Sequence, residues 1–393
     1  MLIYNKQWID NLEIQEQSAN WLKKSFISKE EFDAIALKYE SLYHASNMFV
    51  RAGMFLFTLL IIVSSVGLFN LFALASNQMA IALQSLFFGG VYYFVTANFV
   101  KQRHYFRSGI TDALLYASVI SASTGVVFAF SGNNFAFNLD PVIYIAAVLP
   151  IFIFASIRFR DAFLALLSFI GLFTINVLLV LKAGTIGKLI LPFEGMIFSF
   201  IIYWISKSWK KREGWHYWKK CFSIVEAASL VTLYLSGNYL VVRELSNMLA
   251  GSFIVPGEDI PFAYFFYAFT IAAPLLYVWL GMKQKNYMLI RAGILLVAAG
   301  IMSIRYYYSI LAPEIALTVA GIFLIAVAWL GISYLKIPRN GITSVEDDDS
   351  RNEAFEAIGS VLVSRAAGGT IHSKEDNPFG GGSSGGGGAG SAY

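Results

Sequence analysis

Composition excludes an ordinary water-soluble globular protein. The chain has 393 residues, of which 57% are hydrophobic and only 14% charged, whereas a soluble domain carries about 25% charged residues because its surface meets water. The net formal charge of +4 is distributed as −2 over residues 1–47, +11 over 48–342 and −5 over 343–393. Because the positive charge lies between apolar segments, and not on a soluble face, we expect a membrane protein with no nucleic-acid partner.

The cysteine and histidine content argues against a metal or redox centre. Cys221 is the only cysteine, and the four histidines lie far apart in the sequence. This rules out a disulfide framework and any multi-cysteine metal site. The phosphate-loop pattern GxxxxGK[ST] is also absent, which excludes ATP hydrolysis of that type. We therefore expect no metal and no cofactor, and an enzyme is the less favoured class.

Residues 1–47 predict a small cytosolic segment of amphipathic helix. Trp8 and Leu12 have helical spacing, and Ser28 followed by Glu31 matches the capping box that opens a second helix. Two short helices bury too little apolar surface to be stable alone, so we expect them to dock on the membrane domain or on a partner. The first apolar run begins only after this segment, which argues against a cleavable export signal.

Residues 48–338 predict the membrane domain itself. A spanning helix needs about 20 mostly apolar residues, and about ten stretches of that kind follow one another. We therefore predict an all-α, polytopic transmembrane helical bundle. Its spans are expected at about 52–75, 79–100, 109–130, 140–157, 161–181, 189–206, 221–242, 262–281, 287–304 and 313–335.

The lysines and arginines predict how the bundle is oriented. Of the 21 basic residues in the membrane domain, 17 fall in alternate joins between the predicted spans. Basic residues are retained preferentially on the cytoplasmic side of a membrane. We therefore expect an even number of spans, both termini in the cytoplasm, and a location in a bacterial inner membrane.

Residues 339–393 predict a cytosolic tail without a packed core. Glu346 and the three aspartates after it form an acidic run, and a short amphipathic helix is expected over 351–366. From Gly380 onward the chain is almost entirely glycine and serine. Such a segment has no side chains to bury and loses much backbone entropy on ordering, so we expect it to be flexible and disordered.

Two carboxylates inside predicted spans are the candidates for an intramembrane polar or proton path. Glu226 lies a few residues inside the seventh span, and Glu194 lies early in the sixth beside Pro192. An ionisable group within a bilayer is costly and is a functional candidate by default, with Arg243 or Arg305 as its counter-charge. The alternative is that such residues lie near the interface and extend to water. That alternative is favoured for Asp112, Arg291, Arg305 and Glu314.

The join at residues 207–220 combines positive charge with aromatic rings. Lysines gain on the order of 1 kcal/mol each near an anionic leaflet, and indole rings favour the headgroup region. The stretch predicts a contact with anionic lipids or with an acidic segment, and the alternative is a topology signal with an aromatic belt. Its candidate contact residues are Lys210, Lys211, Arg212, Trp215, Trp218, Lys219 and Lys220.

Ile27, Ser28 and Glu30-Glu31 form an Ile-Ser-x-Glu turn in the polar segment that leads to the first span. At these positions the opening of the chain resembles a broad family of uncharacterised bacterial multipass membrane proteins. Ser25-Phe26 departs from the glycine common at such turns. The resemblance covers about fifty residues and implies a short cytosolic helix-turn-helix before a many-helix membrane domain. It implies no reaction.

Three classes of function follow from these features. The first is non-ATP-driven permeation or transport of a small solute or ion, with Glu226 and Glu194 as polar groups within the bundle. The second is a non-catalytic scaffold or sensor that recruits protein partners through its cytosolic termini. The third, and least favoured, is a membrane-embedded enzyme acting on lipid.

Overall fold

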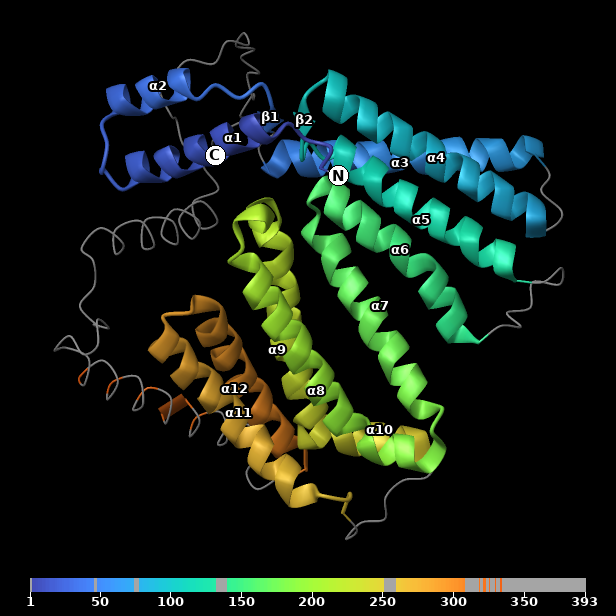
Figure 1. Ribbon diagram of the computed structural model, residues 1–393, viewed down its shortest axis with the longest axis vertical. Helices are drawn as coiled ribbons and strands as arrows, with labels where there is room; N and C mark the ends of the chain where they lie inside the picture. The colour runs from blue at the N-terminus through green and yellow to red at the C-terminus, as the bar shows by residue number, and fades with distance from the viewer. Residues whose placement is uncertain are drawn as a thin grey trace, which may run out of the picture. The chain divides into compact units, whose positions relative to one another are not determined.

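The computed structural model describes residues 2–45, 48–73, 78–131, 140–250 and 259–307, together with six isolated helical residues between 318 and 333. The chain divides into two compact units, residues 1–316 and 317–393. The first unit is helical apart from one two-stranded parallel pair in its described part (Figure 1). The predicted tail, 339–393, lies outside the described residues, and the predicted tenth span is represented only by those six positions.

Two helices and a short strand form the N-terminal segment. Helix α1 covers Lys6–Lys23 and helix α2 covers Lys29–Lys38, and strand β1 follows at His44–Ala45. The predicted capping box is confirmed: the Glu31 backbone N–H donates to the Ser28 hydroxyl at 3.2 Å, and the Ser28 N–H donates to the Glu31 carboxylate at 2.8 Å. The polar cap satisfies N–H groups that the first turn leaves unpaired.

Seven of the described helices are long and apolar enough to cross a membrane, so the chain is a multipass membrane protein. They are α3 (Met48–Ala73), α4 (Gln78–Gln102), α5 (Ile110–Phe130), α6 (Pro141–Phe159), α7 (Ala162–Leu181), α8 (Gly184–Lys210) and α11 (Ala263–Gln284). Strand β2 (Tyr105–Phe106) lies between α4 and α5 and pairs with β1.

An eighth span is bent. A 3-10 helix, η1 (Glu213–Trp218), leads into α9 (Lys219–Gly237), and α10 (Tyr239–Ala250) follows at an angle of 68°. The bend falls at Asn238, which is buried and whose side-chain amide donates to the hydroxyls of Tyr234 at 2.9 Å and Ser303 at 3.0 Å. Helix α9 alone has 19 residues and is about 28 Å long, and it counts as a candidate span only together with α10.

The prediction of ten spans exceeds the seven or eight found among the described residues. One reason is α12 (Tyr287–Tyr307), whose apolar part, Tyr287–Ser303, is shorter than the other spans. The other is that the predicted tenth span falls mostly outside the described part of the chain. Hydropathy counts apolar windows, and it does not distinguish a full span from a short apolar helix.

Within the first unit, most helices that follow one another along the chain pack as neighbours, whereas α3 packs on α5 (Figure 1). Helices α4 and α5 approach closely, and a Cβ added at Gly89 would lie 2.9 Å from the Ala122 backbone nitrogen. Small residues allow such contact between membrane helices. The Ser118 hydroxyl of α5 also donates to the Gly89 carbonyl at 2.8 Å. Tight backbone packing therefore joins these two helices.

The N-terminal segment docks on the end of the bundle at which α4, α6, α8 and α11 finish, referred to below as the basic end. The Ile3 N–H donates to the Arg158 carbonyl at 3.1 Å. The Arg160 guanidinium, on the α6–α7 turn, donates to Glu13 at 2.9 Å. The Tyr217 hydroxyl of η1 donates to Asp10 at 2.9 Å. The expectation that the short helices dock on the membrane domain is confirmed.

Candidate functional site

A pocket lined by cations opens at the basic end, between the α8–α9 hairpin and the α11–α12 turn. Its volume is about 1010 Å³. Six of the lining side chains are Lys or Arg and one is a carboxylate, so the formal charge of the lining is +5. We call it the basic pocket; its lining residues are Lys207, Lys210, Lys211, Lys219, Glu226, Gln284, Lys285, Asn286, Tyr287, Met288 and Arg291.

The ends of the helices place these cations. Lys207 and Lys210 lie in the last turn of α8, where cations are stabilised by the negative end of the helix dipole. The Lys207 ammonium donates to the Gln284 side-chain oxygen at 2.8 Å and to the Tyr203 hydroxyl at 3.0 Å. The first of these bonds joins α8 to the end of α11. Lys285 follows directly and closes α11 in a left-handed conformation, with φ +51°.

Among the described residues, Glu226 is the one carboxylate that lines the basic pocket, and it is 1% exposed. It lies seven residues beyond the start of α9, or roughly 10 Å along the helix axis. The Lys210 ammonium donates to its Oε2 atom at 3.1 Å. A buried carboxylate is tolerated when a cation pairs with it, so Glu226 and Lys210 form a unit at the floor of the pocket.

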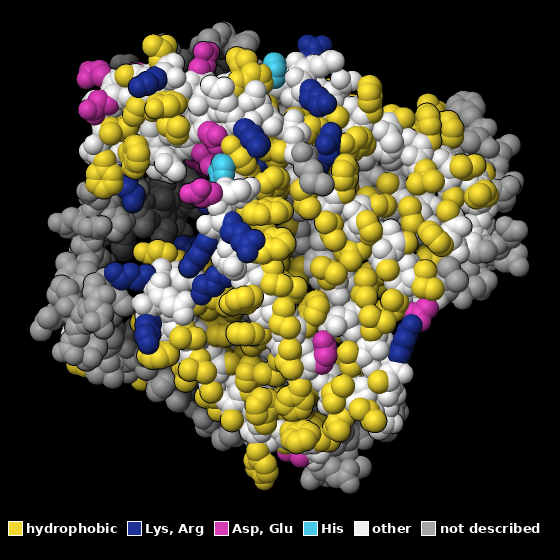
Figure 2. Space-filling view, viewed as in Figure 1, with side chains coloured by type: hydrophobic (Ala, Val, Ile, Leu, Met, Phe, Trp, Pro, Cys, Tyr) yellow, Lys and Arg dark blue, Asp and Glu magenta, His cyan; other side chains and the backbone are white. Residues whose placement is uncertain are grey.

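The surface around the basic pocket differs from the rest of the face seen in Figure 2. Lys and Arg side chains gather over the ends of α8 and α9, whereas hydrophobic side chains cover most of the lower part of that face (Figure 2). The separation is the one expected when one part of a membrane protein meets headgroups and water and the other meets acyl chains.

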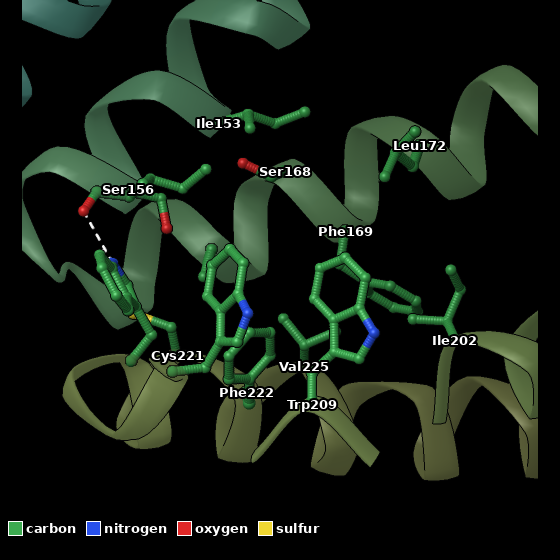
Figure 3. Close-up of a pocket in the computed structure, with 14 residues that line it drawn as sticks. Ile153, Ser156, Ser168, Phe169, Leu172, Ile202, Trp209, Cys221, Phe222 and Val225 are labelled. Carbon is green, nitrogen blue, oxygen red and sulfur yellow. Dashed lines mark hydrogen bonds between the residues drawn. The ribbon is translucent and has the colours of Figure 1, made fainter. Parts of the chain in front are cut away.

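A second, smaller pocket lies on the opposite side of the α8–α9 hairpin, against α6 and α7. It has a volume of about 270 Å³ and an almost wholly apolar wall (Figure 3). Trp209 and Trp215 stack with ring centroids 5.3 Å apart. The Trp218 indole N–H donates to the Ile157 carbonyl at 2.7 Å, which holds η1 against α6. We call it the tryptophan pocket.

The structure divides the predicted basic and aromatic cluster of residues 207–220 between these two pockets. Lys210, Lys211 and Lys219 line the basic pocket, whereas Trp215 and Trp218 line the tryptophan pocket. Arg212 and Lys220 are exposed and line neither of them. Alternating residue types in the sequence therefore correspond to two separate surfaces in space.

Glu194 is not among the residues that line the basic pocket with Glu226. It lies half-buried on α8, and the Asn176 side-chain amide of α7 donates to both of its oxygens, at 2.6 and 2.7 Å. The two carboxylates predicted to share a path thus have different partners on different helices. Asp112, predicted to lie near an interface, pairs with Arg51 of α3 at 2.7 Å.

The part of the basic pocket that α11 and α12 supply was not predicted from the sequence. Gln284, Lys285 and Asn286 form the turn between these helices, and Arg291 follows on α12. Nothing in their local spacing marks them as partners of Lys207, more than seventy residues earlier. The tryptophan pocket likewise takes Phe169 from α7, a residue that reads as an ordinary position of an apolar span.

Among the described residues, no group of three or more His, Cys, Asp or Glu side chains is arranged to hold a metal ion. Cys221 is buried against the tryptophan pocket. Comparison of the chain with family models, with characterised proteins and with solved structures gives no match.

Proposed function

We propose that this membrane protein mediates non-ATP-driven permeation or transport of a small anionic solute, and that the basic pocket is where the solute binds. The observation that carries the proposal is the pocket itself: about 1010 Å³ lined by six cationic side chains and a single, buried carboxylate. Like charges held together repel one another, and a bound anion relieves that repulsion. Phosphate and carboxylate groups match lysine and arginine donors best.

In this proposal Glu226 acts through Lys210. The carboxylate holds the ammonium at 3.1 Å and lowers the net charge of the empty pocket. An arriving anion competes with Glu226 for the same ammonium group. Binding is therefore reversible, which a permeation pathway requires, because a site that binds too tightly does not release its solute. Glu194 stays a candidate polar group deeper in the bundle.

The same chemistry comes from two sources, a free anion or the headgroup of an anionic lipid. Inorganic phosphate and vesicles of phosphatidylglycerol are the two probes. The purified protein in nanodiscs of phosphatidylcholine is titrated with phosphate by calorimetry, and uptake of radiolabelled phosphate is followed in proteoliposomes. Saturable phosphate binding and uptake support a solute site. Absence of saturable phosphate binding overturns the transport proposal, and phosphatidylglycerol binding that Lys219→Gln weakens then assigns the basic pocket to lipid.

Neighbouring lysines provide a matched pair of variants. Lys219 lines the basic pocket, and Lys220, the next residue, does not. Both are exposed, so neither substitution creates a buried defect. We expect Lys219→Gln to weaken phosphate binding about three- to tenfold, the loss of roughly 1 kcal/mol, and Lys220→Gln to leave it unchanged. Equal effects of the two substitutions contradict a defined site.

We further propose that the protein lies in a bacterial inner membrane with its basic end in the cytoplasm. The location of 17 of the 21 basic residues in alternate joins supports this orientation. Reporter fusions at the two ends test it. We also propose that the chain is related to a family of uncharacterised bacterial multipass proteins. The helix-turn-helix at Ser28 supports this relationship.

The second candidate function is a scaffold or sensor. It is supported by the docked N-terminal segment, in which α2 has no buried residue and Leu37 is 86% exposed. An exposed leucine on a helix offers an apolar contact to a protein partner. If this function holds, Leu37→Glu abolishes a co-purifying partner and leaves phosphate binding intact. Loss of phosphate binding in that variant contradicts the separation of the two roles.

A further inference from the structure

The tryptophan pocket is built by the ends of four helices that follow one another in the chain. Helices α6 and α7 supply one wall, and α8, η1 and α9 supply the other, which includes Trp209 of α8 (Figure 3). The side formed by Trp209 and the η1 residues Trp215 and Trp218 is called the rim. Three tryptophans in one small pocket are unusual for a packing defect, since close packing fills such space with side chains. Tryptophan prefers the headgroup boundary of a bilayer, which places the rim near that level.

The two serine hydroxyls and the Trp218 indole N–H of the wall are already hydrogen-bonded. The Ser168 hydroxyl donates to the Leu164 carbonyl at 2.8 Å, and the Ser156 hydroxyl donates to the Asp161 carbonyl at 3.2 Å. The Trp218 indole N–H is used in holding η1. A ligand of this pocket therefore meets hydrocarbon and ring surface, and a polar ligand loses hydrogen bonds to water without replacement.

The apolar surface continues outward from the pocket along the helices that form it. Phe163 of α7 is 51% exposed and Trp204 of α8 is 64% exposed, as expected of side chains that meet acyl chains. Cationic residues flank η1 in the chain. Exposed Arg212 directly precedes η1, and exposed Lys220 directly precedes the pocket residue Cys221.

We infer that the tryptophan pocket binds one acyl chain of an anionic phospholipid, whose headgroup pairs with Arg212 and Lys220. A chain enters from the surrounding bilayer and exchanges contact with other chains for contact with the ring faces of Trp209 and Trp215. The headgroup contributes attraction of about 1 kcal/mol per nearby cation. The inference is independent of the proposed transport function, because it concerns the other side of the α8–α9 hairpin.

Brominated lipids provide the test, because bromine on an acyl chain quenches nearby tryptophan. The full-length protein is reconstituted with phosphatidylglycerol carrying brominated chains and then diluted into lipid-free detergent. Lipid on the general protein surface dissociates into the detergent, whereas an acyl chain bound in the tryptophan pocket stays with the protein. We expect residual quenching in the wild type and less of it in Trp215→Phe, which removes one of the three indoles that line the pocket. Trp204→Phe removes a lipid-facing indole outside the pocket, and we expect this variant to retain the residual quenching of the wild type.

A pocket-filling variant gives a second readout. Ala165 lines the pocket, and Ala165→Phe occupies the space that a chain needs. We expect about tenfold less phosphatidylglycerol to co-purify, measured by mass spectrometry of the intact complex. If that variant destabilises the fold, Arg212→Gln with Lys220→Gln lowers retention of phosphatidylglycerol to the level of phosphatidylcholine. Equal retention of both lipids by the wild type, or no residual quenching, overturns the inference.

Discussion

The Lys210 ammonium and the Glu226 carboxylate lie 3.1 Å apart, with the carboxylate 1% exposed. Lys210 belongs to the last turn of α8 and Glu226 to the second turn of α9. The pair therefore joins the two helices of the hairpin that separates the basic pocket from the tryptophan pocket. The pair therefore contributes to the stability of the hairpin and, in the proposed function, to anion binding.

Removing the cation of this pair is expected to destabilise the protein. Lys210→Met leaves Glu226 buried without a counter-charge, at a cost of about 1–3 kcal/mol, less than for a fully buried pair because the lysine side chain is 33% exposed. Adding Glu226→Gln recovers part of that loss. Unfolding temperatures measured in one detergent at one heating rate check this, with Lys211→Met as the control. A double variant less stable than Lys210→Met contradicts the pairing.

Arg160 is expected to control the docking of the N-terminal segment. The residue is 6% exposed and its guanidinium bonds to Glu13 at 2.9 Å. Arg160→Met removes this charge-assisted bond, and we expect faster hydrogen exchange over residues 2–45 with little change in α7–α9. Lys24→Met, on the exposed turn after α1, serves as the control. Unchanged exchange in the Arg160 variant means that other contacts hold the segment.

Gly109 is expected to be intolerant of any side chain. Its φ is +84°, and an added Cβ would lie 2.1 Å from the Arg51 carbonyl oxygen. Gly109→Ala therefore combines backbone strain with a clash between α3 and the start of α5, and we expect a loss of at least about 2 kcal/mol. Gly90→Ala, which meets nothing within 4 Å, is the matched substitution. Thermal unfolding compares the stabilities of the two variants, and equal unfolding temperatures for Gly109→Ala and Gly90→Ala disprove the clash.

Alkaline pH is expected to release the N-terminal segment. Burial raises the pKa of the Tyr4 phenol above its ordinary value of 10.0, and the carboxylate of Asp112 adds to the rise. A raised pKa means that this contribution to docking is complete below pH 10 and is lost as the pH rises above it. Limited proteolysis of residues 2–45 between pH 8 and 11 measures the effect. Tyr4→Phe should flatten the profile, and an equally steep profile contradicts the assignment.

Several local features were predictable from the sequence because short-range chemistry decides them. The capping box at Ser28 and Glu31 depends on a spacing of three residues, and the structure contains both of its hydrogen bonds. The spanning helices depend on runs of apolar residues about as long as a bilayer is thick. Docking of the N-terminal segment follows from how little apolar surface two short helices bury on their own.

The bend at Asn238 was not predictable in the same way. The predicted seventh span ran from residue 221 to 242 without a break, because hydropathy stays high across it. In the structure the Asn238 side chain bonds to Tyr234 and Ser303. Ser303 belongs to α12, 65 residues away. A polar side chain in a span finds its partner only once the helices have packed, and that partner sets where the chain turns.

By itself the sequence determined that this chain resides in a membrane as a helical bundle, because low charge and repeated apolar runs leave no other solvent for its surface. Only the tertiary structure decided which residues share a site. An α-helix turns about 100° per residue, so Trp209 and Lys210, adjacent in sequence, line different pockets. Conversely, the Lys207 ammonium of α8 donates to the Gln284 side chain of α11 at 2.8 Å, a contact that no local pattern encodes.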